Sequence, residues 1–338
     1  MGGGGGGSAA ELWRHPEVPI DASINLDWYI RQARQAEEAL FDFVFVTDSQ
    51  YIEPTFTQHH LNRLEPLTLL SAVATYTSRI GLAATVTTSY TEPFDIARRL
   101  ASLDLISGGR AGWNIVTSYD SGTAGNFSRA DHGDHAHRYR RGTEAVTVVH
   151  GLWNSYEDDA FASDKDAVSY LDTTRLHRLD HKGEFFSVTG PLNIQRSRQG
   201  EPVIIQAGTS EPGRELNARF AELASSFAKT TEWALAFAPM FVRGRQPTAA
   251  TSTTSSSSPP SVSESATPTN KHWYRTGAAD GFNLFAGEPE DFSAFRHRVI
   301  PLLQQSGLFR TDYESDTFRG NLQLPTPKNT HTLTEQSA

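Results

Sequence analysis

From residue 21 to residue 223 the sequence alternates between short apolar runs and longer amphipathic runs. The apolar runs are rich in β-branched and aromatic residues, which favours strands, whereas the longer runs carry apolar residues at helical spacing. The pattern predicts strands at 41–48, 80–90, 110–118 and 202–210, and helices at 21–40, 67–79, 92–106, 139–153 and 211–223. Because a helix separates each strand from the next, we expect βαβ units and a parallel sheet.

The predicted strands are apolar almost throughout, which is typical of a sheet that is buried on both faces. A doubly wound sheet and a (β/α)8 barrel both fit this pattern. No G-x-G-x-x-G motif lies between a strand and a helix; Gly108, Gly109 and Gly112 precede a strand and are interpreted as a turn. This counts against a dinucleotide-binding domain of the Rossmann type.

Charge and composition exclude several classes of function. The formal net charge is -9, so the chain lacks the basic surface that a nucleic acid partner requires. Cysteine is absent, which excludes disulfides, thiolate zinc sites and cysteine nucleophiles. No apolar run approaches the roughly 20 residues of a membrane-spanning helix, and the glycine-rich start does not resemble a signal peptide. We therefore expect a cytoplasmic protein that binds neither nucleic acid nor a membrane.

The pattern changes after about residue 244. Residues 246–270 form a Ser, Thr and Pro tract that is too polar to build a core, while 277–284 predicts a strand and 291–305 a helix. A hairpin is predicted at 184–194. The predicted organisation is a disordered Gly-rich start (1–12), a main α/β part (13–245), a low-complexity linker (246–270), a returning C-terminal part (271–325) and a disordered tail (326–338).

Small polar or acidic residues lie at or near the ends of the predicted strands. Asp48 ends the first strand, Thr85 lies late in the second, Thr117 and Ser118 end the third, and Thr209 and Ser210 end the fourth. The carboxyl ends of parallel strands and their loops form the active sites of barrels and open sheets, so a ligand site is expected there. The alternative is that each Ser or Thr only caps the helix that follows.

Two segments suggest specific contacts. In AGTSEPGREL, Ser210 occupies the N-cap position ahead of Pro212 and Arg214. This pattern predicts either a phosphate-binding site or a helix cap without a ligand. In HAHRYRRGTEAV, His135 and Tyr139 are four residues apart and share a helix face. They predict either a ligand contact or a solvated helix start. The neighbouring histidines do not share a face, so no metal site is predicted.

Several long motifs, in order, carry a resemblance to a known family. RLEPLTLLSAVATYTSRIGLAATVTTSY, RRLASLDLISGGRAGWNIVTS, HAHRYRRGTEA and GPLNIQRSRQGEPVIIQAGTSEPGREL resemble the flavin-dependent monooxygenases of the nitrilotriacetate monooxygenase component A type. These belong to the bacterial luciferase-like superfamily, whose members fold as TIM-type barrels. The resemblance runs from about residue 13 to 222 and resumes in GAADGFNL and in residues 299–315.

The resemblance implies an FMN site and a two-component reaction. The motif positions that match the family's flavin contacts are Asp48, Thr85, His135, Tyr139 and Ser210. Reduced FMN would come from a separate NAD(P)H:flavin reductase, and one oxygen atom of O2 would be transferred to a small organic substrate. No catalytic acid or base is assigned, although His135 is a candidate. A homodimer is compatible with the resemblance.

The sequence departs from the family pattern in two places. GGGGGGSAAEL stands where the family has its apolar first strand, and a shorter, polar segment replaces a longer one between residues 228 and 272. The expected fold is therefore an incomplete TIM-type (β/α)8 barrel that lacks its first strand and a later segment. The alternative function is a truncated, non-catalytic flavin-binding remnant. A phosphosugar enzyme on a barrel fits Ser210 but not the long motifs.

Overall fold

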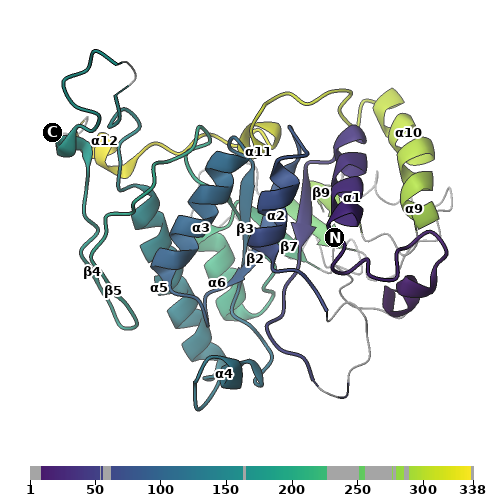
Figure 1. Cartoon of the computed structure of the whole chain (residues 1–338), viewed down its shortest axis with the longest axis horizontal. Helices are drawn as coiled ribbons and strands as arrows, with labels where there is room; N and C mark the ends of the chain where they lie inside the picture. The colour runs from purple at the N-terminus through teal and green to yellow at the C-terminus, as the bar shows by residue number, and fades with distance from the viewer. Residues whose placement is uncertain are drawn as a thin grey trace.

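A seven-stranded parallel sheet forms the centre of the molecule (Figure 1). The computed structural model describes residues 9–53, 55, 62–162, 165–226, 251–255, 276, 279–284 and 289–335. The sheet order is β1-β2-β3-β6-β7-β8-β9, and every neighbouring pair is parallel. The strands are β1 (Phe43–Val46), β2 (Gly81–Thr87), β3 (Ala111–Val116), β6 (Val203–Gln206), β7 (Leu223–Ser226), β8 (Thr251–Ser255) and β9 (Gly281–Asn283).

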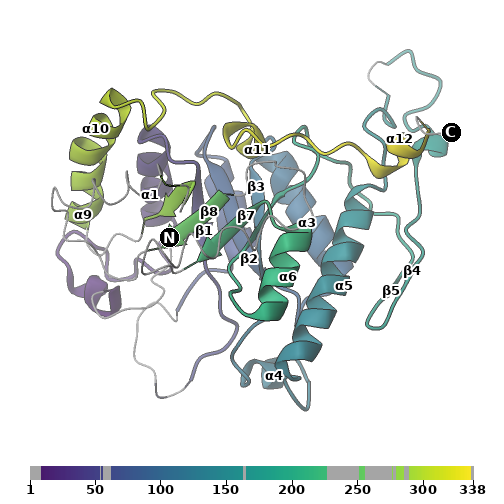
Figure 2. The ribbon, with the colours of Figure 1, turned by 180° about the vertical axis from the view of Figure 1, so that it is seen from behind.

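Helices connect the strands and cover the outer face of the sheet. Helices α1, α2 and α3 lie toward the viewer in Figure 1, and α5 and α6 lie toward the viewer in Figure 2. The helices are α1 (Leu26–Glu38), α2 (Pro66–Ala74), α3 (Pro93–Ile106), α4 (Thr123–Asn126), α5 (His135–Trp153), α6 (Glu211–Phe220), α9 (Pro289–Ala294), α10 (Ile300–Gln305), α11 (Phe318–Asn321) and α12 (Thr330–Glu335). Short helical turns are η1 (Ala9–Arg14), η3 (Thr173–Arg175) and the π-helical η4 (Phe295–Val299).

Capping side chains and prolines determine where three of the helices begin. Asn25 caps α1 by accepting a hydrogen bond from the backbone N–H of Trp28 at 3.0 Å. Pro66 and Pro93 occupy the first positions of α2 and α3, where a missing N–H costs nothing. The predicted helix 21–40 therefore begins later than expected, because Asn25 supplies the capping oxygen.

Strand β2 shows how the sheet separates two cores. Leu82, Ala84 and Val86 pack with the helices in the larger hydrophobic cluster. Ala83 points the other way, into a smaller cluster on the concave face. Because side chains alternate along a strand, Thr85 also faces the concave side, one step closer to the carboxyl end of the sheet.

Phe318 of α11 closes one end of the concave face. A Cβ built on Gly81 would lie 2.5 Å from the Phe318 ring, and one built on Gly112 would lie 2.8 Å from it. Only glycine therefore lets both strands approach the ring. Arg319 holds the same helix by donating two hydrogen bonds to the Glu222 carboxylate beside β7. Figure 2 shows this C-terminal segment crossing one end of the sheet, opposite α4.

The chain that follows β9 returns to the side of the first helix. Phe292 of α9 packs on Phe41, just ahead of β1, with ring centroids 5.8 Å apart. Arg296 pairs with Glu38 of α1 at 3.1 Å. Both views place α9 and α10 beside α1 (Figures 1 and 2). The two edge strands of the sheet thus lead into elements that pack together, as in a curved half-barrel.

The predicted fold class is confirmed at this level: the chain is an α/β protein with a parallel half-barrel sheet. Several predicted boundaries differ from the structure. The strand expected at 41–48 ends at Val46, and the helix expected at 139–153 begins at His135. The helix expected at 211–223 ends at Phe220, and Leu223 begins β7, which pairs between β6 and β8. The hairpin expected at 184–194 lies earlier, with β4 (His181–Lys182) and β5 (Ser187–Val188). The Glu144 carboxylate fixes its turn by accepting the N–H groups of Phe185 and Phe186.

Two described elements lie inside stretches for which the sequence predicts a low-complexity linker or a Gly-rich start. Thr251–Ser255, inside the low-complexity tract, forms β8, because a strand between two others needs backbone partners rather than apolar side chains. Ala9–Arg14 forms η1 inside the expected disordered start. The other residues of the 246–270 tract, and residues 1–8, lie outside the described residues.

The segment that follows α11 contacts the end of α5 and continues to residue 335. Asn329 is only 1% exposed, and its amide donates to the backbone carbonyls of Asn154 and Tyr156. The segment then enters α12. These two carbonyls follow the end of α5, where helix carbonyls have no partner within the helix. The Asn329 amide supplies the missing donor and so attaches this segment to α5. Residues 336–338 lie outside the described residues.

No helix among the described residues is both long enough and apolar enough to cross a membrane.

Replacing the closing ring tests this packing. We expect Phe318→Ala to lower the free energy of unfolding by about 3–5 kcal/mol, because it leaves a cavity between two glycines that cannot fill it. Urea denaturation followed by circular dichroism measures the loss. Phe282→Ala, at a side chain that is 38% exposed, serves as the control and should cost much less. Equal losses in the two variants would contradict the assigned role of Phe318.

Candidate functional site

The loops at the carboxyl edge of the sheet are tied to one another. The Ser49 hydroxyl, after β1, donates to the Asp120 carboxylate after β3 at 3.3 Å. The hydroxyl oxygens of Thr87 and Ser118 lie 2.8 Å apart. In the same region, the Ser89 hydroxyl donates to the carbonyl of Thr117 at 2.7 Å. These bonds join the first three strands of the sheet into one rim.

A polar pair lies below this rim on the concave face. The Asn114 amide donates to the Thr85 hydroxyl at 3.0 Å, between directly paired positions of β3 and β2. Asn114 is 4% exposed, and its Oδ1 has no hydrogen-bond partner in the described part of the chain. Asn114 also pairs in register with Ile205 of β6, a member of the apolar concave cluster. The floor of the rim is therefore apolar except for this pair.

Helix α5 starts at the rim. Asp134 caps it by accepting the backbone N–H of His137 at 2.7 Å. The ring centroids of His135 and Tyr139 are 4.7 Å apart, which confirms that the two residues share a helix face. His135 is exposed, whereas Tyr139 is partly buried. A Cβ on Gly142 would lie 3.1 Å from the Thr88 hydroxyl, so this glycine lets the helix approach β2 closely.

Tyr139 meets the loop that follows β6. A Cβ built on Gly208 would lie 2.9 Å from the Tyr139 hydroxyl oxygen and 2.6 Å from the Gln206 amide nitrogen. Gln206 fixes this loop by accepting hydrogen bonds from the N–H of Gly208 at 2.6 Å and from the Asn217 amide. Gly208 thus lets a phenol and an amide approach the backbone of this loop closely, and any other residue here would clash with them.

Ser210 occupies the N-cap position of α6, as the sequence predicted. Its Oγ accepts the backbone N–H of Gly213 at 3.3 Å, and Pro212 lies in the first turn. Gly213 also packs on Gly208, since a Cβ on it would lie 2.9 Å from the Gly208 Cα. The N-terminus of α6 lies beside a glycine and a tyrosine hydroxyl. Free backbone N–H groups at a helix N-terminus and a hydroxyl are donors that can bind a phosphate.

Asp48 lies two residues past the end of β1, in the loop that follows this strand. Val46, the last residue of β1, pairs with Ala84, so this loop begins beside Thr85. Burial raises the pKa of Asp48 above its usual range, and the charge of Arg63 opposes that shift. Among the described residues, no hydrogen bond joins Asp48, Thr85, His135, Tyr139 and Ser210 directly to one another.

The structure therefore places the five predicted residues at one edge of the sheet, at different depths. Thr85 lies at the floor, Asp48 in the loop after β1, and Tyr139 and Ser210 on either side of Gly208. His135 lies outermost. The sequence analysis did not single out Asn114 or Gly208. Asn114 could have been recognised from the sequence, because it is the one polar residue in the run AGWNIV.

His132, for which the sequence predicts no metal-binding role, contacts Tyr90 at the end of β2. His132 Nδ1 lies 2.5 Å from the Tyr90 hydroxyl, and the two rings stack with centroids 5.9 Å apart. Burial lowers the pKa of His132, which favours its neutral form. The pair fixes the loop after β3 against the end of β2. In the described residues no group of three His, Asp or Glu side chains could hold a metal ion.

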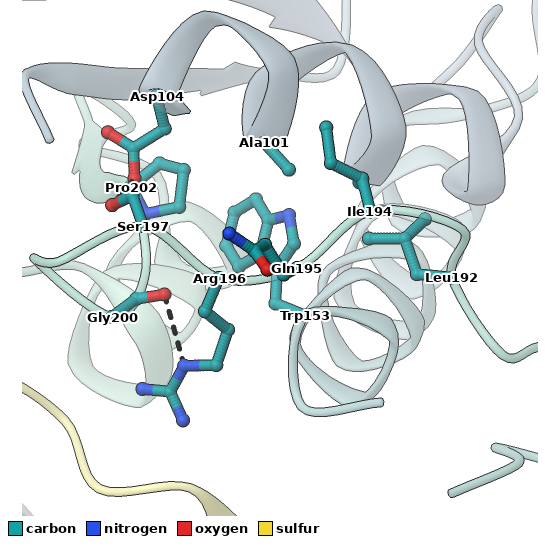
Figure 3. A pocket seen from close by; sticks show the side chains of 10 residues that line it. All are labelled: Ala101, Asp104, Trp153, Leu192, Ile194, Gln195, Arg196, Ser197, Gly200 and Pro202. Atoms are coloured by element: carbon teal, nitrogen blue, oxygen red, sulfur yellow. Dashed lines mark hydrogen bonds between the residues drawn. The ribbon is translucent and has the colours of Figure 1, made fainter. Parts of the chain in front are cut away.

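A separate pocket lies at the opposite end of the sheet (Figure 3). It is lined by Asp104 of α3, Trp153 of α5 and the segment ahead of β6, far along the helices from the rim. Asp104 is buried and accepts hydrogen bonds from the Ala111 N–H, the Gln199 amide and the Ser197 hydroxyl. Burial raises the pKa of Asp104 to about 6. These contacts hold α3, β3 and the loop together, so we assign this end to stability.

Comparison with known proteins identifies similar chains. The family model described as luciferase-like monooxygenase matches residues 9–266. Nitrilotriacetate monooxygenase component A of Aminobacter aminovorans is 33% identical over 426 residues, covering 94% of each chain. N-acetyl-S-(2-succino)cysteine monooxygenase of Bacillus subtilis (strain 168) is 51% identical over 219 residues, covering 65% of this chain. This chain spans about half (50%) of that second relative's length.

A solved structure has the same fold. A riboflavin lyase, solved with a modified FMN and its substrate riboflavin, superposes with a TM-score of 0.84 at 25% sequence identity. The superposition covers 95% of this chain and 94% of the lyase. The 426-residue alignment with the Aminobacter protein is longer than the 338 residues of this chain. That relative therefore contains segments, inside the matched span, that have no counterpart here.

The buried carboxyl of Asp104 predicts a pH dependence of stability. Its pKa is about 6 in the folded chain and near the usual 3.8 when unfolded, so between these values the folded state holds a proton that the unfolded chain releases. The free energy of unfolding should fall as the pH rises through this window, by at most about 3 kcal/mol. Asp104→Asn should remove that part of the slope in urea denaturation between pH 4 and pH 7. An unchanged slope would contradict the assignment.

Proposed function

This chain belongs to the luciferase-like monooxygenase family, and on that premise we propose that it is an FMN-dependent monooxygenase. It would take reduced FMN from a separate NAD(P)H:flavin reductase and use O2 to oxygenate a small organic substrate. The family is of the FMN-dependent flavoprotein type, and its members include oxygenase components of two-component systems. The name "component A" of the Aminobacter relative supports the dependence on a partner.

One observation carries the proposal. The glycine at 208 brings the Tyr139 hydroxyl close to the loop that leads into the N-terminus of α6, at the same rim as the Thr85–Asn114 pair. A phosphate needs N–H and O–H donors, and the N-cap of α6 with the Tyr139 phenol supplies them. A flat aromatic ring needs an apolar floor with few polar groups, and the concave face beneath the rim has that character.

These residues fit FMN by their chemistry. Ser210, Tyr139 and the first turn of α6 would hold the phosphate, and Thr85 would contact the ring. Asp48 would contact the flavin from the loop after β1, and His135 would contact it from the exposed start of α5. No positively charged side chain is required at the phosphate, because the helix N-terminus carries a partial positive charge.

Reduced FMN, when bound, supplies the electrons with which O2 is activated, so that one oxygen atom enters the substrate and the other leaves as water. The chain's own residues bind and orient. Thr85 offers a buried hydroxyl on the concave face, where few waters compete. The hydrogen bonds that tie the loops together, such as Thr87 to Ser118, keep the rim in one arrangement. Exclusion of water protects a reactive flavin from wasteful breakdown.

We further infer that the half-barrel corresponds to a TIM-type luciferase barrel without its first strand. The order of β1 to β9, and the packing of α9 on Phe41, support a sheet curved toward closure between β9 and β1. The segments that the Aminobacter relative has in excess favour the second candidate, a flavin-binding chain without turnover. Both candidates share the FMN site and differ in activity.

A flavin titration tests the site. We expect purified protein to quench the fluorescence of oxidised FMN. Gly208→Val should weaken binding by at least tenfold, because its side chain would clash with the Tyr139 hydroxyl and the Gln206 amide and displace them from the proposed phosphate site. Gly125→Ala is the matched control, since a Cβ there meets no atom within 4 Å and should leave the dissociation constant unchanged. Equal binding by all three proteins would place the flavin elsewhere, and no quenching by the wild type would remove the FMN site.

Turnover separates the two candidates. Wild-type protein supplied with a flavin reductase, NADH, FMN and O2 should convert one member of a panel of aminopolycarboxylates, thioethers and heterocyclic sulfur compounds. The names of the two relatives motivate the first two classes. Substrate-dependent product formation, measured by mass spectrometry with 18O2, should show one labelled oxygen atom. Tight FMN binding with no labelled product from any class would favour the non-catalytic candidate.

A further inference from the structure

We propose that His177 and His331 form a pH-sensitive switch, which keeps the C-terminal helix in place at neutral pH and releases it when both rings are protonated. The pair lies at the end of the sheet that Phe318 closes, away from the proposed FMN site, so the inference does not depend on the proposed function. Two observations lead to it: the two imidazole rings stack on each other, and only one of them is paired with a carboxylate.

The two rings are in direct contact. Their centroids are 3.7 Å apart, and their planes differ by 13°. His331 lies in α12 and His177 follows η3, so the stack joins the C-terminal helix to the loop that follows α5. Both views place α12 beside this loop (Figures 1 and 2). Two imidazoles can stack at this distance while at most one of them is charged, whereas two imidazolium ions repel each other.

A charge on His177 would be balanced by a buried carboxylate. Glu157 is 7% exposed, and its Oε1 lies 2.7 Å from His177 Nε2. The Arg175 guanidinium lies 3.8 Å from the same carboxylate and also pairs with Asp159 and Asp172. When His177 takes up a proton, its charge therefore lies against Glu157, and the stack with a neutral partner ring is preserved.

A charge on His331 would have no such partner. Within the described part of the chain, its ring contacts His177 and its backbone N–H donates to Asn329 Oδ1 at 2.9 Å, but no ion pair reaches the ring. Burial lowers the pKa of His331, and the charge of His177 lowers it further, while Glu157 opposes the shift. His177 and Glu157 are the titratable groups that face this ring.

The shift of His331 gives the direction of the pH effect. With α12 in place its pKa lies below the usual 6.5, to which it returns when the helix leaves. The closed form therefore binds fewer protons than the open form, and a fall in pH through this range favours the open form. The neighbouring anchor does not titrate, because the Asn329 amide donates to the Tyr156 carbonyl at 2.7 Å. We expect residues 331–335 to leave while Asn329 stays attached.

A spin label tests the release, because a chain without cysteine accepts a single labelled position. Thr332→Cys with an attached nitroxide should give an immobile EPR spectrum at about pH 7.5, and a mobile component should appear below about pH 6.5. In the labelled chain, His331→Phe keeps a ring for stacking but takes up no proton, so its spectrum should stay immobile down to about pH 5. His177→Phe removes the second charge and should also abolish the transition.

His297→Phe is the matched control, because His297 is an exposed histidine on η4. This variant should keep the transition of the labelled wild type. A transition that persists in His331→Phe would overturn the assignment to this pair. An EPR spectrum of the labelled wild type that is the same at both pH values would overturn the switch itself.

An NMR titration of the unlabelled protein tests the coupling without the label. The pKa of His331 should lie below 6.5 in the wild type and should rise in His177→Phe, because the neighbouring charge is gone. An equal pKa in the two proteins would overturn the coupling. His331→Phe should bind FMN with the affinity of the wild type at neutral pH, so a failure of the proposed function would leave this result unchanged, and a loss of FMN affinity would contradict the separation of the pair from the flavin site.

Discussion

The packing of one phenylalanine against two glycines sets the polarity of the concave face. Phe318 enters the sheet from α11 and fills the space that Gly81 and Gly112 leave open. Apolar side chains pack next to this ring along the concave face of the strands. The first polar side chains toward the carboxyl edge are Thr85 and Asn114. The face is thus closed and dry at one end and polar at the other. Among the described residues, the polar side chains of the concave face therefore lie toward the carboxyl edge of the strands.

The two ends of the sheet have different tasks. At the closed end, Arg319 is fixed to Glu222, and Asn329 is fixed to carbonyls after α5, so the C-terminal segment ties distant strands and helices together. At the rim, single hydrogen bonds join loops that begin at different strands. This division follows the general behaviour of parallel α/β sheets, in which the amino-terminal ends carry stability and the carboxyl-terminal ends carry chemistry.

The rim combines side chains whose roles depend on depth. Ser210 and Tyr139 are placed at the entrance, where a phosphate can keep part of its hydration. Asn114 and Thr85 are placed at the floor, where an unpaired polar group is costly. Phosphate and ring are the two chemically distinct parts of FMN. The proposal that FMN binds here follows from the separation of these two environments along one face.

Local patterns in the sequence determined the alternation of strands and helices, the cap at Ser210 and the face shared by His135 and Tyr139, because each depends on neighbours within a few residues. Only the tertiary structure decided that Leu223 starts a strand, that Thr251–Ser255 joins the sheet and that Asn329 is buried. Those outcomes depend on backbone partners and carbonyls contributed by distant segments. The partner of Asn114 is Thr85 for the same reason, since sheet register, and not sequence spacing, brings them together.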